Sequence, residues 1–344
     1  MTKKYDYLII GQGIAGSAFA WNLYLNDKSF LIIDSKEKNT ASEAALGIYN
    51  PITGRRNSLT WNVDKLFDTT EDFYLKIGNI LGKKIISKKN IYRPFKTNRD
   101  LNDWNIRAEN TKFKKYIKKI DNKGILTSKS GYLDVLKYLT ESRKYFKSHN
   151  RYIEKKINSK NIMIEDRKIV IGDINAKYVV MCIGINQNNL NLFSNLPLRP
   201  VSGNSILAEV NFNSTHIVNN KISVINTSKN NVHAGSTYHN GFENMGTEKI
   251  EKQLKEIVQK KYKIKEYKFG VRPATRDRRP FVGRHSNIDN LYILNGLGSK
   301  DVEMDFYFSR YPLFQGYQTG SKSGKKLAPL LGKLKDFDGG TTDI

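Results

Sequence analysis

Three glycines near the N-terminus have the spacing of a phosphate-binding turn. Gly11, Gly13 and Gly16 follow an apolar run of strand length, and the residues after them favour a helix. In such a turn the first glycine permits the tight bend, the second lets the backbone approach a pyrophosphate, and the third lets helix and strand pack closely. The N-terminus of the helix, with Ile14 and Ala15 in its first turn, offers free N–H groups to the phosphates.

An acidic residue completes this motif. A second apolar run stops at Asp34, which lies 18 residues beyond Gly16. Its carboxylate can accept hydrogen bonds from a ribose 2′-hydroxyl group. The alternative interpretation is a glycine-rich turn in some other α/β protein. That alternative does not explain why the strand, the helix and the acidic residue all stand at the expected positions. This stretch therefore predicts a βαβ unit that binds an adenine dinucleotide, either FAD or NAD.

Length and composition indicate a globular protein, with two domains that can be interleaved. The chain has 344 residues, of which 39% are hydrophobic and 11% aromatic, and no apolar run of about 18 residues predicts a membrane span. No small-residue cleavage site follows the first strand, so we expect no signal peptide and a cytoplasmic location. The single cysteine, Cys182, excludes an intramolecular disulfide and a cysteine-built zinc site, and is interpreted as a core residue. The five histidines show no metal-ligand spacing.

The net charge of +25 has two explanations. A strongly basic protein often binds nucleic acid or an anionic surface. However, the excess consists mainly of lysine, with 43 Lys against 15 Arg, and the chain is also rich in Asn, Ile and Tyr. This mixture is typical of an AT-rich coding bias. The lysines are dispersed, with only short clusters at 112–119 and 260–268, so nucleic-acid binding is the less favoured explanation.

Hydrophobic periodicity predicts the elements that must hold the motif. The pattern indicates helices over 60–82 and 247–262, and a helix that opens at Gly131 with Leu133, Leu136, Leu139 and Phe146 on one side. It also indicates a small antiparallel ribbon within 152–174, a buried strand over 178–184, an antiparallel sheet over 205–238 and a strand over 291–294. Ser42 precedes the small residues Ala44, Ala45 and Gly47, which would let the backbone approach a flat ligand. The alternative is an ordinary helix start that Ser42 caps.

Together these pieces resemble the D-amino-acid oxidase family of FAD-dependent oxidoreductases, which includes glycine oxidase and sarcosine oxidase. The resemblance spans nearly the whole chain. It is strongest in the glycine motif with Asp34 and in residues 42–47, 179–184, 270–283 and 295–300. The pattern Gly-x-Arg-Pro-x-Thr-x-Asp-x-x-Pro-x-x-Gly from Gly270 to Gly283 is the most specific motif of this resemblance. With the N-terminal motif it favours FAD over NAD.

The resemblance implies an α/β fold, α+β overall, with a discontinuous Rossmann-like FAD-binding domain. Residues 1–82, 131–195 and 269–344 would form that domain. Residues 83–130 and 196–268 would form a substrate domain, whose antiparallel sheet roofs the flavin. The implied cofactor-binding residues are Gly11, Gly13, Ile14, Ala15, Gly16, Asp34, Ser42, Ala45, Gly47, Gly184, Gly296, Gly298, Ser299 and Lys300.

At the flavin, the resemblance places Ala45 and Gly47 beside the isoalloxazine ring. Backbone N–H groups of residues 296–300 would face flavin N1 and O2, where negative charge develops on reduction, and Lys300 would add a positive charge there. Arg272 occupies the position of the arginine that grips a substrate carboxylate with its planar fork. The alternative for Arg272 is a structural salt bridge. Tyr238 is the candidate for a substrate hydrogen bond from the roof sheet, because 222–225 contains no aromatic residue.

The implied reaction oxidises a C–N bond of an amino acid or a secondary amine. The substrate gives its α-hydride to the flavin, the imine hydrolyses, and oxygen or another acceptor reoxidises the cofactor. No catalytic histidine or carboxylate pair is needed, since positioning provides most of the catalysis.

Two alternatives follow from departures within the resemblance. Ser299 and Asp301 stand where glycine-oxidase-like members carry arginine and glycine, and residues 303–306 break an apolar stripe. A catalytically degenerate flavin-binding protein is therefore one alternative. Residues 48–51 and 275–280 are similar to bacterial members of unassigned substrate and to the oxidoreductase half of the bifunctional enzyme that matures the tRNA wobble uridine. An oxidoreductase of a modified tRNA nucleoside is the other alternative.

Overall fold

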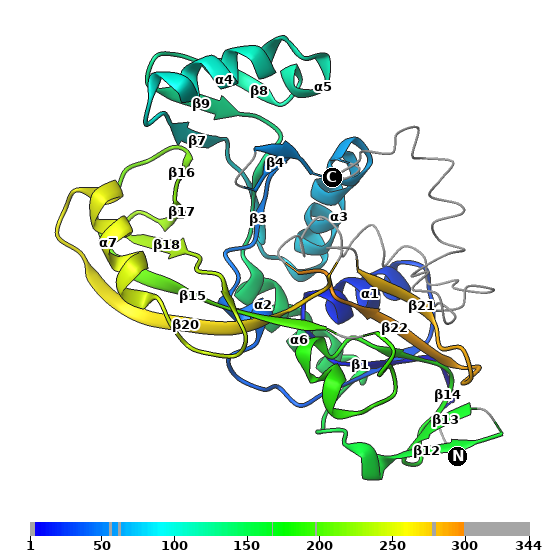
Figure 1. The fold of residues 1–344 in the computed structure, drawn as a ribbon. Coiled ribbons are helices and arrows are strands. Elements are labelled where there is room, and N and C mark those ends of the chain that lie inside the picture. Colours follow the sequence, from blue (N-terminus) through cyan, green and yellow to red (C-terminus); the bar gives the residue numbers. More distant parts are fainter. Residues whose placement is uncertain are drawn as a thin grey trace.

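The computed structural model describes residues 4–54, 57–60, 63–166, 168–196, 198–276 and 280–298. Two sheets, one of six strands and one of nine, organise this part of the chain, and three small sheets accompany them (Figure 1). The residues predicted to form the flavin edge, Ser299, Lys300, Asp301 and 303–306, lie outside the described residues. In the described part, no helix is long and apolar enough to cross a membrane.

The six-stranded sheet contains the glycine motif. Its strands, in spatial order, are β11 (Tyr152–Glu154), β2 (Phe30–Asp34), β1 (Lys4–Ile10), β14 (Asn175–Met181), β22 (Leu291–Asn295) and β21 (Phe281–Arg284). The first five run parallel and β21 runs antiparallel to β22. Both faces of β1 are buried, with Ile9 in one hydrophobic cluster and Leu8 in another. Burial on both faces explains why these strands read as continuous apolar runs.

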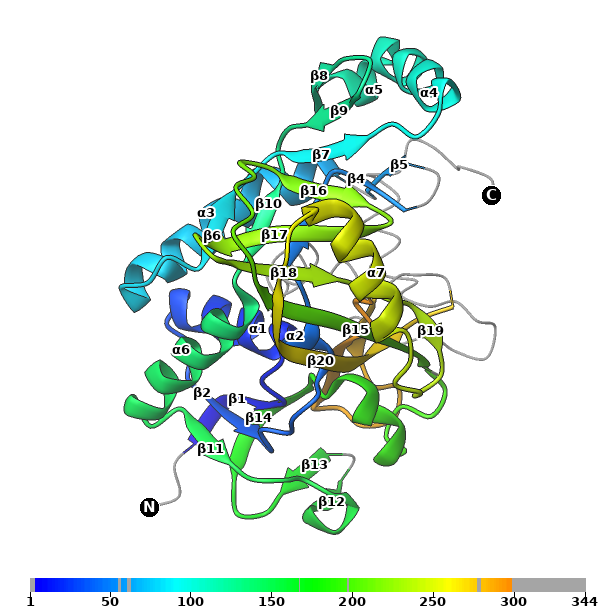
Figure 2. The ribbon, with the colours of Figure 1, turned by 90° about the vertical axis from the view of Figure 1, so that its left-hand side faces the viewer.

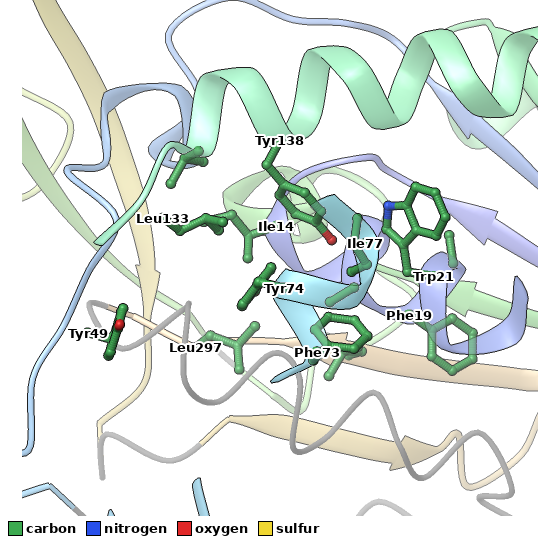
Figure 3. Close-up of a cluster of buried hydrophobic side chains, with 14 of the residues drawn as sticks. Ile14, Phe19, Trp21, Tyr49, Phe73, Tyr74, Ile77, Leu133, Tyr138 and Leu297 are labelled. Atoms are coloured by element: carbon green, nitrogen blue, oxygen red, sulfur yellow. The ribbon is translucent and has the colours of Figure 1, made fainter. Parts of the chain in front are cut away.

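Helices cover one face of this sheet. They are α1 (Ile14–Leu25), α3 (Val63–Leu81) and α6 (Val135–Ser148). Trp21 on α1 donates a hydrogen bond to the Ser142 hydroxyl on α6, over 2.8 Å, and both groups are buried. The rings of Tyr74 and Tyr138 meet edge-to-face with centroids 5.3 Å apart, and Figure 3 shows these side chains converging. The packing fixes α1 against the sheet, and α1 carries the phosphate-binding end of the motif.

The nine-stranded sheet lies beside the first (Figure 2). Its strands are β19 (His239–Asn240), β15 (Arg199–Glu209), β18 (Asn231–Gly235), β17 (Ile222–Ser228), β16 (Ile217–Asn220), β7 (Ile91–Pro94), β9 (Gly124–Thr127) and β8 (Ile117–Ile120), while β20 (Lys263–Ala274) pairs with β15. Its strand pairs are antiparallel except β16 with β7. Helix α7 (Thr247–Val258) packs Ile250 and Leu254 on one face. Helices α4 (Asn98–Glu109) and α5 (Thr111–Lys114) lie at the far end, next to β8 and β9.

Three small sheets and a few short helical segments accompany the two large sheets. The strands β3 (Ile48–Tyr49), β10 (Gly131–Leu133) and β6 (Ile86–Lys88) form one small sheet, β4 (Ile52–Thr53) pairs with β5 (Ser58–Leu59), and β12 (Ile162–Glu165) pairs with β13 (Lys168–Ile171). The remaining helical segments are α2 (Ala41–Ala44), η1 (Ser159–Asn161) and η2 (Gly184–Asn189).

Four local predictions were wrong in whole or in part. Gly131–Leu133 is a strand rather than a helix start, because it pairs with β3 and β6, and the helix begins at Val135 after the cap Asp134. Leu136 is 46% exposed and does not share the buried side of α6. Only part of 152–174 is an antiparallel ribbon, since β11 joins the parallel sheet. In place of Ser42, Thr40 caps α2 by accepting the Glu43 N–H.

The α/β fold is confirmed by this architecture, whereas the domain boundaries stay a prediction. All six strands of the six-stranded sheet come from 1–82, 131–195 and 269–344, and eight strands of the larger sheet lie within 83–130 and 196–268. Strand β20 crosses the predicted boundary at 268, because its long pairing with β15 continues to Ala274.

Candidate active site

The residues predicted to bind the cofactor gather where the parallel strands end. Strands β1, β2, β14 and β22 run in the same direction, so their carboxyl ends meet at one edge of the sheet. The residues in or after these ends are Gly11, Asp34, Gly184 and Gly296. Open α/β sheets bind their ligands at this edge.

The glycine turn is tightly enclosed by backbone. Gly11 has φ +99°, and a Cβ there would lie 2.5 Å from the carbonyl oxygen of Cys182. A Cβ on Gly16 would overlap the carbonyl oxygen of Gly11. Both positions therefore require glycine. Gly11 needs it for its positive φ and for the close contact with the Cys182 carbonyl, and Gly16 needs it for the close contact with the Gly11 carbonyl alone.

The first turn of α1 keeps hydrogen-bond donors available. Gly13 is the N-cap of the helix and supplies no side-chain cap. The Ile14 N–H donates to the Ser42 hydroxyl over 3.2 Å, but within the described residues the N–H groups of Ala15 and Gly16 have no acceptor. A helix start with unsatisfied N–H groups favours a bound anion such as a pyrophosphate.

Asp34 is held in place by the turn. Its carboxylate accepts the Gln12 N–H over 2.9 Å and the Lys36 N–H over 3.0 Å, and Arg143 Nη2 lies 3.7 Å from Oδ2. The Tyr152 hydroxyl donates to the same oxygen over 3.4 Å. Burial first, then the charge of Asp34, raises the pKa of Tyr152 to about 12, so this hydroxyl keeps its proton. These contacts fix the orientation of the Asp34 carboxylate, which remains a hydrogen-bond acceptor.

The segment from Thr40 to Gly47 borders the turn on one side. A Cβ on Gly13 would contact the Ser42 hydroxyl at 3.1 Å. Gly47 has φ +70°, and a Cβ there would overlap the carbonyl oxygen of Leu133. The small residue at 47 is therefore required by the contact with β10 and by its backbone conformation. Ala45 follows α2 and is half-buried.

The large sheet is hydrogen-bonded to this segment. The Ser205 hydroxyl on β15 donates to the Ala44 carbonyl over 2.8 Å, and His233 Nε2 lies 2.9 Å from the same hydroxyl. Burial first, then the charge of Lys268, lowers the pKa of His233 to about 3, so the imidazole is neutral at physiological pH. A neutral chain of hydrogen bonds therefore joins the sheet to residues 40–47. This segment and the glycine turn from Gly11 to Gly16 together form the cradle of the predicted cofactor site.

The far side of the edge is organised by Asn295 at the end of β22. Its side-chain amide donates to the Gly184 carbonyl and to Gln187 Oε1, each over 2.8 Å, and its Oδ1 accepts the Gly296 N–H over 2.8 Å. Within the described residues, no atom lies within 4 Å of the position that a Cβ would take at Gly184 (φ +56°) or Gly298 (φ +68°). At this side of the edge, a bound ligand would therefore meet backbone atoms of Gly184 and Gly298 rather than side chains.

Arg272 lies on β20 close to the cradle, since Val271 bridges to Thr40 and a Cβ on Gly270 would lie 2.6 Å from the Thr40 carbonyl. Its guanidinium donates to the carbonyl oxygens of Ser202 (3.3 Å) and Thr237 (3.2 Å) and to the Ser236 hydroxyl (3.0 Å). These acceptors are all neutral.

The charge of Arg272 has no carboxylate partner among the described residues. The guanidinium carbon lies 4.3 Å from the ring centroid of Tyr238, which is 61% exposed. The two predicted substrate-binding residues are thus adjacent, and the salt-bridge alternative for Arg272 finds no partner in the part of the chain that the structure describes.

The residues present fit a dinucleotide cofactor. The available N–H groups of α1, the oriented carboxylate of Asp34 and the bare backbone at Gly184 and Gly298 are the features that an adenine dinucleotide requires. The family model for FAD-dependent oxidoreductases of the D-amino-acid oxidase (DAO) type matches residues 6–304. The chain belongs to this family. FAD is therefore its cofactor, and the prediction of an FAD-dependent oxidoreductase is confirmed.

Solved structures of this family share the fold. Iminodiacetate oxidase from Chelativorans sp. BNC1 superposes with a TM-score of 0.74 at 17% identity, covering 88% of this chain and 93% of that one. Glycine oxidase from Geobacillus kaustophilus gives 0.73 at 16%, covering 90% and 93%. L-proline dehydrogenase from P. horikoshii gives 0.69 at 14%, covering 90% and 92%. At these identities the likeness shows the fold of the DAO family.

Several residues of the DAO-family site were not singled out from the sequence. Three of them are Asn295, Ser205 and Tyr152. Each forms a hydrogen bond to a residue more than 100 positions away in the chain, so no local pattern reveals the contact. A polar residue directly after an apolar strand run, as at Asn295, is the one signal in the sequence that points to such a contact. Within the described residues, no group of His, Cys, Asp and Glu could hold a metal ion.

Proposed function

We propose that this DAO-family enzyme oxidises a C–N bond of an amino acid or a secondary amine that carries a carboxylate. The proposal rests on one observation above all, the charge of Arg272. The guanidinium is half-buried and lies beside the segment that lines the cradle, and among the described residues it hydrogen-bonds only to neutral oxygens. A carboxylate would supply the missing negative charge, and a guanidinium binds it with two parallel hydrogen bonds.

The neighbouring residues suit a small substrate. Tyr238 stacks against the guanidinium and leaves 61% of its surface exposed, so its ring can contact a substrate bound at Arg272. The bonds to Ser202, Thr237 and Ser236 hold the fork in one orientation. Orientation of this kind contributes to catalysis by holding the α-carbon in a productive geometry.

The reaction requires no acid–base residue in the described part of the site. FAD, when bound, supplies a hydride acceptor. The neutral amine loses the hydrogen of its α-carbon with the electron pair, which leaves an iminium ion, and water then hydrolyses it to a carbonyl compound and the free amine. Oxygen or another acceptor takes up the two electrons in the oxidative half-reaction.

The test is reduction of the bound flavin by substrate under anaerobic conditions. Arg272→Ala is expected to retain FAD while its reduction by carboxylate-bearing amines slows at least about 100-fold, since a charge-assisted pair is worth roughly 3 kcal/mol or more when one partner is removed. Arg199→Ala is the matched control, because Arg199 is an exposed arginine at the start of the neighbouring strand β15. Loss of FAD from Arg272→Ala alone would assign this arginine a structural role.

A second candidate function is oxidation of a modified tRNA nucleoside. Residues 83–130 contain 15 Lys and Arg against 4 Asp and Glu. Most of this segment forms β7, α4, α5, β8 and β9, which project from one end of the molecule (Figures 1 and 2). Contacts between such a surface and RNA phosphates would be strongly salt-dependent. A gel-shift with tRNA over a salt series tests this candidate, and steeply salt-dependent binding without flavin reduction by free amines would favour it.

A further inference from the structure

A second cavity lies away from the FAD cradle. Its volume is about 570 Å³. Helix α3 forms one wall, and the turns before β7, β10 and β16 form the other, in the upper half of Figure 1. The residues around it are Phe67, Glu71, Asp72, Lys88, Lys89, Asn90, Lys129, Ser130, Thr215 and His216. None of these residues belongs to the predicted cofactor or substrate sites.

Lys89 brings an uncompensated positive charge to this cavity. Its ammonium group donates to the backbone carbonyl of Asn226 over 3.1 Å and lies 6.0 Å from the ring centroid of Tyr132. No carboxylate of the described chain forms an ion pair with it. Burial first, then the nearby charge of Lys84, lowers its pKa below the ordinary value for lysine. In contrast, Lys88 is neutralised by an ion pair with Glu71.

His216 adds a second polar group without a partner. Within the described residues neither ring nitrogen makes a hydrogen bond, although the residue is half-buried. Burial, followed by the charges of Lys118 and Lys89, lowers its pKa. The imidazole is therefore neutral at physiological pH and can donate one hydrogen bond. The side chains of Asn90 and Thr215 likewise have no hydrogen bond within the described part of the chain.

We propose that this cavity binds a small organic anion through a phosphate or carboxylate group held by Lys89, His216 and Asn90. An anion there would compensate the half-buried ammonium and satisfy donors that the protein leaves unused. The opposite wall limits what else the ligand can carry. Glu71 and Asp72 on α3 disfavour further negative charge on that side and favour hydroxyl or amine groups, while Phe67 offers an apolar contact.

The cavity adjoins the segment that borders the glycine turn. Lys89 lies over Tyr132, and the backbone of Tyr132 pairs with Ile48, the residue after Gly47. Binding of an anion there does not depend on the proposed substrate, so the two proposals fail separately.

The probes are inorganic phosphate and acetate, titrated into the FAD-loaded protein at constant ionic strength. Binding is followed by calorimetry and by the NMR shift of the His216 ring, assigned with His216→Gln. Lys89→Met, which removes the charge and keeps the apolar stem, is expected to weaken binding about tenfold, and His216→Gln roughly threefold. Lys147→Met is the matched control, because Lys147 is an exposed lysine on α6, outside the cavity.

The outcomes separate the two sources of the anion. Tighter binding of phosphate assigns a phosphate ester, and tighter binding of acetate assigns a carboxylate. The proposal is overturned if neither probe shifts the His216 resonance, or if Lys147→Met weakens binding as much as Lys89→Met. It is also overturned if only a short RNA binds, since that result would indicate a nucleic-acid surface. Flavin absorbance and the melting temperature verify that each variant is folded.

Discussion

Replacing Asp34 with asparagine separates a cofactor contact from a contact that supports the fold. The carboxylate accepts two backbone N–H groups, from Gln12 and Lys36, and lies 3.7 Å from Arg143. Asparagine keeps one acceptor oxygen but turns an NH₂ group towards the second donor. Each hydrogen bond to a charged acceptor contributes about 1.5–3 kcal/mol, against about 1 kcal/mol for a neutral one. We therefore expect Asp34→Asn to lose about 1–2 kcal/mol of stability.

The FAD affinity should fall in addition to this loss of stability. If Asp34 accepts a ribose hydroxyl, the exchange of a charged for a neutral acceptor weakens FAD binding about tenfold. The assay is titration of the apoprotein with FAD, followed by quenching of flavin fluorescence, together with thermal melting of both forms.

Asp6→Asn is the matched control for Asp34→Asn. Asp6 accepts the Ser29 N–H and hydroxyl at the opposite end of β1 and β2, over 3.2 and 2.7 Å. Those bonds hold the pKa of Asp6 below its ordinary value, the largest cause being the Ser29 hydroxyl. The control is expected to melt earlier but bind FAD as tightly as the wild type. Equal FAD affinity for Asp34→Asn and Asp6→Asn would refute the ribose contact.

Two further predictions concern the cradle. Gly11→Ala places a Cβ 2.5 Å from the Cys182 carbonyl oxygen at φ +99°, so thermal melting should show that the protein loses more than about 2 kcal/mol of stability. Gly172→Ala is the control, because Gly172 has φ +55° and no described atom within 4 Å of its Cβ position, so it measures the conformational cost alone, about 1 kcal/mol. Equal losses of stability for the two variants would contradict the steric argument. His233 has a pKa of about 3 when folded, against an ordinary value of 6.5, so the unfolded chain binds the extra proton and stability falls as pH drops from about 6.5 towards 3. His233→Gln should remove up to about 1.4 kcal/mol per pH unit of that slope in chemical denaturation at a series of pH values, and an unchanged slope would show that His233 is not the group responsible.

The local part of the site could be predicted from the sequence. Gly11, Gly13 and Gly16 act within one strand–turn–helix unit, and their spacing alone predicts the turn that the structure contains. Asp34 follows the next strand, so its position at the same edge also follows from a parallel sheet. The family match, which covers residues 6–304, agrees with the FAD interpretation drawn from these motifs.

The rest depends on pairing between distant segments. Gly131–Leu133 has helix-like periodicity with the residues after it, yet its backbone pairs with β3 and β6, and these non-local hydrogen bonds override the local pattern. The contact between Arg272 and Tyr238 joins two segments that are adjacent only because β20 and β18 flank β15. No local spacing encodes such a contact. The same holds for the Ser205 bond to Ala44, which spans 161 residues of the chain.

The most direct test of the proposed activity compares amines that differ only in a carboxylate. Purified FAD-loaded protein is mixed anaerobically with an N-alkyl amino acid and with the corresponding amine that lacks the carboxyl group, and the visible flavin absorbance is recorded. Because Arg272 has only neutral partners in the described structure, we predict bleaching by the carboxylate-bearing amine and none by its partner at the same concentration. Equal reduction by both compounds, or reduction by neither across a panel of such pairs, would contradict the proposed function.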